Sequence, residues 1–257
     1  MNAEVVEVRP ETSSAATLGF RLDAPGLDHR PGQWIRIDPH QFGSLSTALR
    51  ERAEKRGKPE GPAYFSISSD ALRSDYLEIT VKTSDRPGGS PLPDFLVRGL
   101  RPGARVAVDG PGGRYGYPDP MPAGLAGVIH VCAGSGTAPN RGLIRHALGK
   151  GWPLKHLLIA QDRTPEDALY RREWEALEAS DGSRFRRRAA FSRTSGDYVS
   201  AALIADAARG FLEPGACLAL ICGPNDPRNG APGFCDLARK ALVDAGVPAD
   251  RVLGERV

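Results

Sequence analysis

Residues 128–139, VIHVCAGSGTAP, place a glycine-rich turn between an apolar strand and a helix. The strand is predicted at Val128–Val131, and apolar residues at helical spacing between 143 and 148 predict the helix. Glycines let such a turn approach a pyrophosphate, and the helix N-terminus supplies unpaired N–H groups and partial positive charge. The same pattern also fits an ordinary strand–helix turn. The expected nucleotide-binding residues of this turn are Gly134, Gly136, Thr137 and Pro139.

Strands and helices alternate from this turn to the end of the chain. Further strands are expected at Leu157–Ala160, Ala189–Phe191, Leu218–Ile221 and Val252–Leu253, and helices at Pro165–Leu177, Tyr198–Ala208 and Phe234–Ala245. This alternation predicts a parallel five-stranded nucleotide-binding sheet covered on both faces, in an α/β domain over residues 121–257.

In the first half of the chain, the spacing of apolar residues is typical of short strands. Six short strands are predicted at Glu4–Val8, Thr17–Leu22, Trp34–Ile37, Tyr64–Ser68, Leu77–Lys82 and Arg105–Val108. Pro-Gly pairs at 31–32, 87–88 and 102–103 separate several of them. The pattern predicts an antiparallel six-stranded β-barrel over residues 1–120, which makes the whole chain a two-domain protein.

A basic helix is predicted to interrupt the barrel at residues 44–56. Leu45, Leu49 and Ala53 are four residues apart, which places them on one helical face. Arg52, Lys55 and Arg56 lie at its end. We expect a solvated face, or alternatively a docking surface for an acidic redox partner or an anionic cofactor.

The composition excludes several classes of protein. The net charge of +3 is too small to predict nucleic-acid binding, and no apolar run approaches the roughly 18 residues that span a membrane. The N-terminus lacks the pattern of a secretory signal, and the four cysteines form no Cys-x-x-Cys pair that would predict a metal site. A cytoplasmic protein with free thiols is expected. The sequence does not determine the oligomeric state.

Three further loops follow predicted strands, where ligands of parallel sheets bind. After Ile221 come Cys222, Gly223 and Pro224, whose thiol could lie beside a flat ring or be a buried structural cysteine. Two other loops carry groups that choose the coenzyme. A hydroxyl, a guanidinium and an aromatic ring favour the 2′-phosphate of NADPH, whereas an acid favours the free ribose of NADH, so both coenzymes remain open. The residues for the phosphate are Ser192, Arg193 and Tyr198. Asp162 is the acid for the ribose, and the neighbouring Arg163 offsets its effect.

Two dehydrogenase families are excluded by their missing residues. A short-chain dehydrogenase needs Tyr-x-x-x-Lys, and none of the six tyrosines is followed by Lys at that spacing. A zinc dehydrogenase needs ligand cysteines that this chain lacks. The second domain therefore has no substrate-reducing residues of its own, and we expect the first domain to accept the hydride.

The motifs, taken in order, resemble those of the ferredoxin–NADP reductase family along nearly the whole chain. Residues 30–33 are similar to its Pro-Gly-Gln turn, 63–69 to its Arg-x-Tyr-Ser flavin motif, and 110–115 to the segment that ends its barrel. Residues 134–139, 162–170 and 222–224 are similar to its nucleotide loops, and Glu255 stands where the family has an acid near the C-terminus.

The resemblance implies a mechanism in which NAD(P)H reduces bound FAD and single electrons pass to a separate ferredoxin, flavodoxin or oxygenase. Catalytic residues would be Ser66 near flavin N5, with Cys222 and Glu255 beside the nicotinamide. Backbone or side-chain contacts to the flavin and its phosphates would come from Ala63, Tyr64, Phe65, Ser66, Ile67, Ser68, Val81, Lys82, Gly89 and Ser90.

Three residues depart from the family pattern. Ala63 stands where the motif has the arginine that meets the flavin phosphates, Phe65 replaces a tyrosine, and Val257 ends the chain where an aromatic residue often covers the flavin. Losing one charge-assisted hydrogen bond costs about 1.5–3 kcal/mol, or ten- to a hundredfold in affinity. A free-flavin or ferric reductase, a non-catalytic binding subunit, and FMN in place of FAD therefore remain open.

Overall fold

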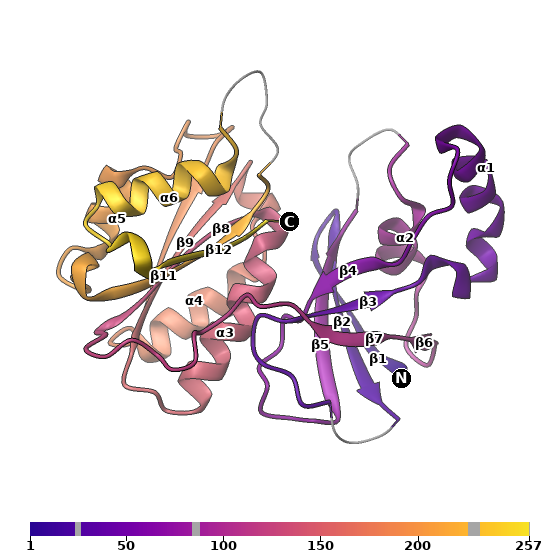
Figure 1. Ribbon diagram of the computed structural model, residues 1–257, viewed down its shortest axis with the longest axis horizontal. Helices are drawn as coiled ribbons and strands as arrows, with labels where there is room; N and C mark the ends of the chain where they lie inside the picture. Colours follow the sequence, from indigo (N-terminus) through magenta and orange to yellow (C-terminus); the bar gives the residue numbers. More distant parts are fainter. Residues whose placement is uncertain (24–26, 84–87, 226–231, 257) are drawn as a thin grey trace. The chain divides into compact units, whose positions relative to one another are not determined.

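The structure is a computed structural model that describes residues 1–23, 27–83, 88–225 and 232–256. It divides into two compact units, Met1–Arg114 and Tyr115–Val257 (Figure 1). The sequence predicted a change of architecture at residues 120–121, close to this division.

The first unit consists of two antiparallel sheets. The four-stranded sheet has the order β5-β2-β1-β6 and the three-stranded sheet the order β4-β3-β7. An isolated bridge between Ile67 and Ile79 links them. The strands are β1 (Asn2–Thr12), β2 (Ala15–Leu22), β3 (Trp34–Ile37), β4 (Ala63–Ser66), β5 (Tyr76–Lys82), β6 (Arg105–Ala107) and β7 (Asp109–Gly112).

The expected six-stranded barrel needs correction in two respects. The described residues form seven strands in two sheets, and closure into a barrel is not seen among them. The strand expected at 105–108 is β6, which pairs with β1, and the sequence did not predict the separate strand β7, which begins at Asp109 and pairs with β3. Val106 and Val108 are both buried, so the alternating pattern runs through this change of sheet and conceals it.

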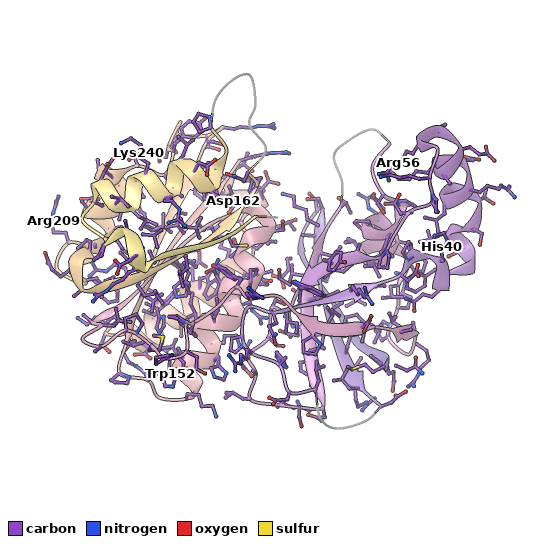
Figure 2. The ribbon with its side chains drawn as sticks, in the orientation of Figure 1. His40, Arg56, Trp152, Asp162, Arg209 and Lys240 are labelled. Carbon is purple, nitrogen blue, oxygen red and sulfur yellow. The ribbon has the colours of Figure 1, made fainter. Side chains whose placement is uncertain are left out.

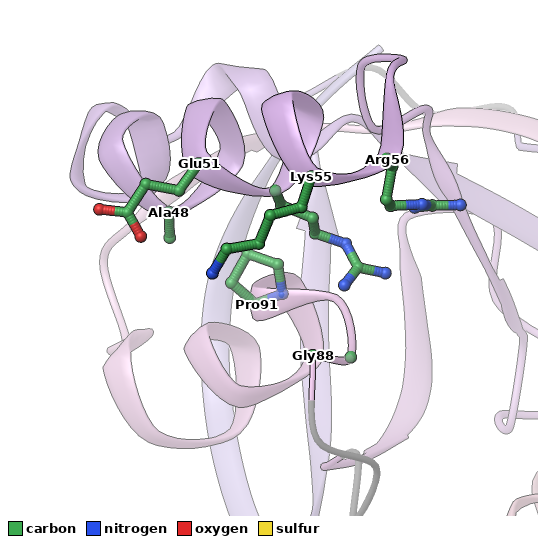
Figure 3. A pocket seen from close by; sticks show the side chains of 8 residues that line it. Ala48, Glu51, Lys55, Arg56, Gly88 and Pro91 are labelled. Carbon is green, nitrogen blue, oxygen red and sulfur yellow. The ribbon is translucent and has the colours of Figure 1, made fainter.

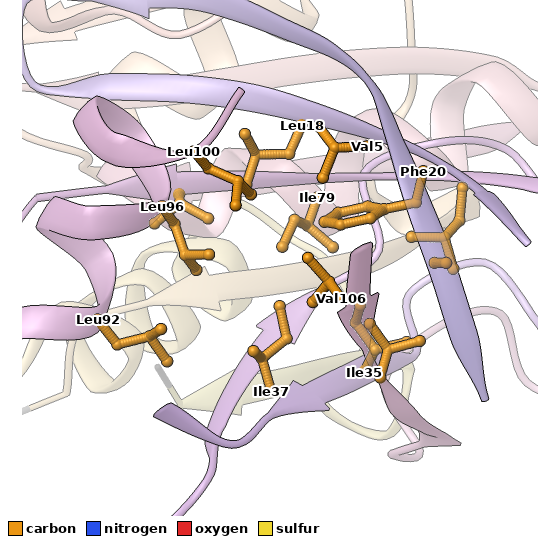
Figure 4. Close-up of a cluster of buried hydrophobic side chains, with 14 of the residues drawn as sticks. Val5, Leu18, Phe20, Ile35, Ile37, Ile79, Leu92, Leu96, Leu100 and Val106 are labelled. Atoms are coloured by element: carbon orange, nitrogen blue, oxygen red, sulfur yellow. The ribbon is translucent and has the colours of Figure 1, made fainter. Parts of the chain in front are cut away.

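Apolar side chains from both sheets form the core of the first unit (Figure 4). Val5, Phe20, Ile35 and Ile79 are among those with no exposed surface. Helix α1 (Ser46–Arg56) contributes Leu49, which confirms the helix predicted from its apolar spacing. The short α2 (Pro91–Asp94) continues into a π-helical turn at Phe95–Gly99.

The second unit is a five-stranded parallel sheet with the order β10-β9-β8-β11-β12, as predicted. Helices cover both of its faces (Figure 1). Ile129 and Val131 of β8 pack with residues of α5 and α6, whereas the preceding Val128 packs with Leu143 of α3. The strands are β8 (Gly127–Ala133), β9 (Lys155–Asp162), β10 (Phe185–Phe191), β11 (Cys217–Gly223) and β12 (Val252–Arg256). The helices are α3 (Thr137–Gly149), α4 (Arg171–Asp181), α5 (Ala201–Ala208) and α6 (Phe234–Asp244).

Two helices begin later than predicted. Residue Tyr170 has φ 56°, so the segment expected as one helix is a 3₁₀ turn at Pro165–Asp167 followed by α4. The Tyr170 ring lies 4.8 Å from the Arg141 guanidinium, a contact that a continuous helix pattern does not reveal. The helix expected from Tyr198 starts at Ala201, because the Ser200 hydroxyl accepts a hydrogen bond from Leu203 N and caps it. Other 3₁₀ turns are Pro39–Gln41, Gly43–Leu45, Gly134–Gly136, Pro214–Ala216 and Ala249–Arg251.

Candidate functional site

The strand order of the second unit creates a topological switch between β8 and β11. The chain proceeds from β8 outward through β9 to β10, and then returns to the opposite side of β8 as β11. Ligands of such sheets bind beyond the carboxyl ends of the strands at the switch. The turn Gly134–Gly136 follows β8, and β11 ends at Gly223, so two of the predicted loops lie at this point.

The two loops are in direct contact through glycine. A Cβ added to Gly136 would lie 2.1 Å from Cys222 O, so no other residue fits there without displacing the backbone. The neighbouring Gly134 has φ 54° and open space where its side chain would be. The turn is therefore packed on one side and open on the other, which fits the approach of a nucleotide phosphate to its backbone.

A buried polar network holds this turn from beneath. Asn140 of α3 donates from Nδ2 to Gly136 O at 2.9 Å. Its Oδ1 accepts from the Tyr115 hydroxyl and from His130 Nδ1, both at 2.9 Å. The other ring nitrogen of His130 is 3.2 Å from His156 Nδ1. Sequence reasoning did not select Asn140 or His130, although a histidine within an apolar strand was a signal of such a network.

Both buried histidines are held neutral. Burial lowers the pKa of His130 to about 4, against a smaller opposing effect of its hydrogen bond with Asn140. Burial, together with the nearby His130 and Arg184, lowers the pKa of His156 well below its usual value. Neutral rings keep one donor and one acceptor each, which the chain from His156 to Asn140 requires.

The predicted coenzyme-selecting residues meet at the ends of β9 and β10. Asp162 (Figure 2) pairs in register with Phe191, its carbonyl accepts from Ser192 N at 3.0 Å, and Arg163 O accepts from Arg193 N at 2.9 Å. The Arg193 side chain is exposed, whereas Asp162 is buried. Val199 N donates to Gln161 Oε1 at 2.8 Å, which brings the exposed Tyr198 to the same end of the sheet.

The remaining predicted residues of this unit lie around the switch. Cys222 is fully buried and pairs in register with Cys132. The Thr137 hydroxyl, also buried, is 3.3 Å from the Cys132 sulfur. Pro224 is exposed beyond β11, and buried Pro139 lies in the first turn of α3. Glu255 pairs in register with Cys222 through its backbone, and its side chain lies outside the described residues.

In the first unit, β4 carries the predicted flavin motif. Its Ser66 is half-buried, and the hydroxyl makes no hydrogen bond within the part of the chain that the structure describes. Phe65 and Ala63 are half-buried and pack against the core. Tyr64 is 59% exposed, and its ring meets that of Trp34 edge to face at 4.7 Å. The half-buried hydroxyl and the exposed ring are consistent with a polar aromatic ligand on this strand, whereas Ala63 offers it no charge.

The predicted backbone contacts lie where β4 approaches β5. Ile67 N donates to Gln33 O at 2.8 Å and Ser68 N to Glu78 O at 2.7 Å. The Thr80 hydroxyl donates to Ser68 Oγ at 3.2 Å. Val81 is buried and Lys82 half-buried at the end of β5, opposite β2. This hydrogen bonding fixes the segment that follows Ser66.

The predicted phosphate-binding turn, Gly89 and Ser90, is followed by the short helix α2. Ser90 caps α2 by accepting a hydrogen bond from Leu92 N at 3.3 Å. Because α2 has four residues, it contributes little of the N-terminal charge that the prediction invoked. Gly89 precedes this cap and lines a cavity beside α1.

Comparison with known proteins agrees with this arrangement. A family profile described as the oxidoreductase NAD-binding domain matches residues 130–227, which include the turn after β8 and the loop after β11. An NADPH oxidoreductase of Mycobacterium tuberculosis is 28% identical over 183 residues, which cover 70% of this chain and 43% of that protein. A ferredoxin–NADP reductase B of Sorangium cellulosum is 28% identical over 177 residues, covering 68% of this chain and 63% of the relative.

The fold extends beyond these sequence matches. The crystal structure of the cytochrome P450 reductase GcoB from Amycolatopsis superposes on 100% of this chain and 69% of its own, with a TM-score of 0.74 and 21% identity. This likeness shows that the chain shares the two-unit fold of that reductase. The chain is similar in sequence to proteins of the ferredoxin–NADP reductase-like family. Its match spans about half the length of the curated relatives.

Two kinds of feature are absent from the described residues. No described helix is long and apolar enough to cross a membrane. No three described His, Cys, Asp or Glu side chains gather as metal ligands.

Proposed function

We propose that this protein is an NAD(P)H-dependent flavoprotein reductase of an electron-transport chain, which takes hydride onto FAD and passes electrons to a separate protein acceptor. The supporting observation is the contact between Gly136 and the backbone of Cys222 at the topological switch. Contacts of this form at a topological switch support the binding of a dinucleotide, and the similarity to ferredoxin–NADP reductases supports the flavin.

Within this proposal, the bound flavin supplies the acceptance of two electrons and their release one at a time. The chain's own residues bind the coenzyme and the flavin and orient them. Gly134 and Gly136 bind the coenzyme pyrophosphate, Ser66 donates its hydroxyl hydrogen toward flavin N5, and Cys222 with Glu255 lines the nicotinamide site. Phe65, Ile67, Ser68, Val81 and Lys82 contact the flavin ring, and Gly89 with Ser90 its phosphates.

The preferred coenzyme in this proposal is NADPH, with NADH as an alternative substrate. The exposed guanidinium of Arg193, with Ser192 and Tyr198 nearby, is available to a 2′-phosphate. Asp162 is buried at the end of β9, where its carboxylate is less available to a ribose hydroxyl.

The acceptor in this proposal is a ferredoxin, a flavodoxin or an oxygenase. The curated relatives include a ferredoxin–NADP reductase, and a structural relative is the ferredoxin reductase in carbazole 1,9a-dioxygenase. The four free thiols favour a cytoplasmic location.

Free-flavin or ferric reduction is the second candidate, favoured by Ala63. That residue leaves β4 without the charge that holds flavin phosphates in relatives of this family. Loosely held flavin would behave as a substrate and leave the protein during purification.

Acceptor kinetics separate the two candidates. A protein-acceptor reductase will reduce ferredoxin or flavodoxin with NADPH while its flavin stays bound, and added free flavin will not raise the rate. The second candidate replaces the first if turnover requires added free flavin, saturates with its concentration, and is unchanged by ferredoxin or flavodoxin.

A further inference from the structure

A cavity of about 530 Å³ lies in the first unit between α1 and the residues that precede α2 (Figure 3). This volume is within the range of small-ligand sites, about 300–1,000 Å³, and exceeds what a lone phosphate requires. Ala48 and Pro91 give it apolar surface, and Gly88 and Gly89 leave one wall without side chains. Its charged lining residues are Glu51, Arg52, Lys55 and Arg56, all from α1.

The two arginines are held in place by one carboxylate. Glu60 Oε2 accepts from Arg52 Nε at 2.5 Å and from Arg56 Nη1 at 3.0 Å. Burial opposes the ionisation of Glu60, but its hydrogen bonds with Arg52 and Ser90 and the nearby Arg56 prevail and lower its pKa. Glu60, which is three residues before Ala63 in the chain, thus links α1 to Ser90.

Lys55 is the cation that this network leaves unpaired. It forms no ion pair within the described ranges of the chain and is exposed. Its side chain extends from α1 toward Pro91, whereas Glu51 projects from the middle of the helix, about one turn earlier (Figure 3). The three cations outnumber Glu51 and Glu60, so the cavity favours an anion.

We propose that this cavity binds the adenylate half of a flavin dinucleotide and that Lys55 pairs with its phosphates. The inference rests on the proposed function and assigns α1 the charge that Ala63 does not supply. The apolar surface of Ala48 and Pro91 suits a base, and the cations suit phosphate oxygens. Arg52 and Arg56, fixed by Glu60, shape the wall, so the helix predicted as a docking surface becomes part of the cofactor site.

The test compares flavins that differ only in their phosphate and adenylate groups. Dissociation constants of FAD, FMN and riboflavin are measured by flavin fluorescence at low salt for the wild-type protein, Lys55→Ala and Lys55→Arg. We expect Lys55→Ala to weaken FAD binding about tenfold, because one charge-assisted hydrogen bond is lost. The affinity for riboflavin should not change. Lys55→Arg restores most of the FAD affinity, and the salt dependence of FAD binding is smaller in Lys55→Ala.

Lys58→Ala is the matched control, because Lys58 is an exposed lysine next to α1 that does not line the cavity. An unchanged FAD affinity in Lys55→Ala, or an equal loss for FAD and riboflavin, overturns the inference and leaves the proposed function intact. A rise in KM for a protein acceptor with unchanged flavin affinity overturns it in favour of a docking surface. Failure of the wild-type protein to bind any flavin overturns both the inference and the proposed function.

Discussion

Arg193 follows the end of β10 and has its side chain in solvent, while its backbone is tied to Arg163 at the end of β9. A guanidinium held in this way recognises a phosphate without being buried. At the residue scale, the choice of coenzyme in our account therefore depends on Arg193 more than on the buried Asp162.

We predict that Arg193→Ala lowers the NADPH to NADH ratio of kcat/KM about tenfold or more, because a charge-assisted hydrogen bond contributes about 1.5–3 kcal/mol. Steady-state kinetics with both coenzymes measure this ratio. Arg188→Ala removes an exposed arginine within β10 and serves as the control. The same ratio in Arg193→Ala and wild-type protein would show that this residue does not contact the 2′-phosphate.

At the element scale, the turn between β8 and α3 depends on neighbours that are distant in sequence. Gly136 abuts the end of β11, and Asn140 joins the turn to Tyr115 and His130. The glycines and the strand–helix pattern predicted the turn. His130 within an apolar strand was a signal of the polar network, but its partners could not be predicted, because they come from separate segments of the chain.

Gly136→Ala is predicted to destabilise the second unit by about 1–3 kcal/mol, because its Cβ would lie 2.1 Å from Cys222 O. Thermal unfolding measures the loss, and we also expect weaker NADPH binding. Gly215→Ala is the control, since its added Cβ would make an ordinary contact at 3.7 Å. A wild-type melting temperature for Gly136→Ala would mean that the two loops are not packed as described.

The pair His130 and His156 predicts a pH dependence of stability. Both pKa values are lower in the folded protein, so between about pH 4 and 6.5 the unfolded chain binds more protons than the folded one. Stability is therefore complete above pH 6.5 and declines below it, by up to about 1.4 kcal/mol per pH unit for each histidine. Denaturant unfolding at several pH values measures the slope. His156→Phe should reduce it, and a slope that is the same in the variant would contradict this assignment.

At the element scale, some secondary-structure elements could be predicted from sequence patterns alone and others could not. The spacing of apolar residues predicted α1, and the alternation of apolar strands with helices predicted the parallel sheet. Both patterns depend on which residues are buried, so they can be read from the sequence. β10 was predicted only from Ala189, yet it begins at Phe185 and includes the basic residues 186–188. It is an edge strand, where charge is tolerated, and Arg186 lies over the Phe211 ring at 4.6 Å. Tyr170 likewise interrupts the helical pattern predicted over 165–177, and its ring contacts Arg141, which is distant in sequence.

At the scale of the whole molecule, each unit has its own core and its own set of candidate site residues. The glycine turn, the β9 and β10 loops and the end of β11 gather in the second unit. The flavin motif and the α1 cavity belong to the first. The division of labour that the sequence predicted, with flavin on one unit and nicotinamide nucleotide on the other, remains our proposal.

The most direct test of this account is the visible absorption spectrum of the purified protein, supplied with FAD, before and after anaerobic addition of NADPH. We predict flavin bands that stay with the protein through gel filtration and bleach on addition, because both cofactors bind and hydride passes between them. A protein that remains colourless after incubation with FAD, or whose bound flavin is not bleached by NADPH or NADH, would contradict the central claim.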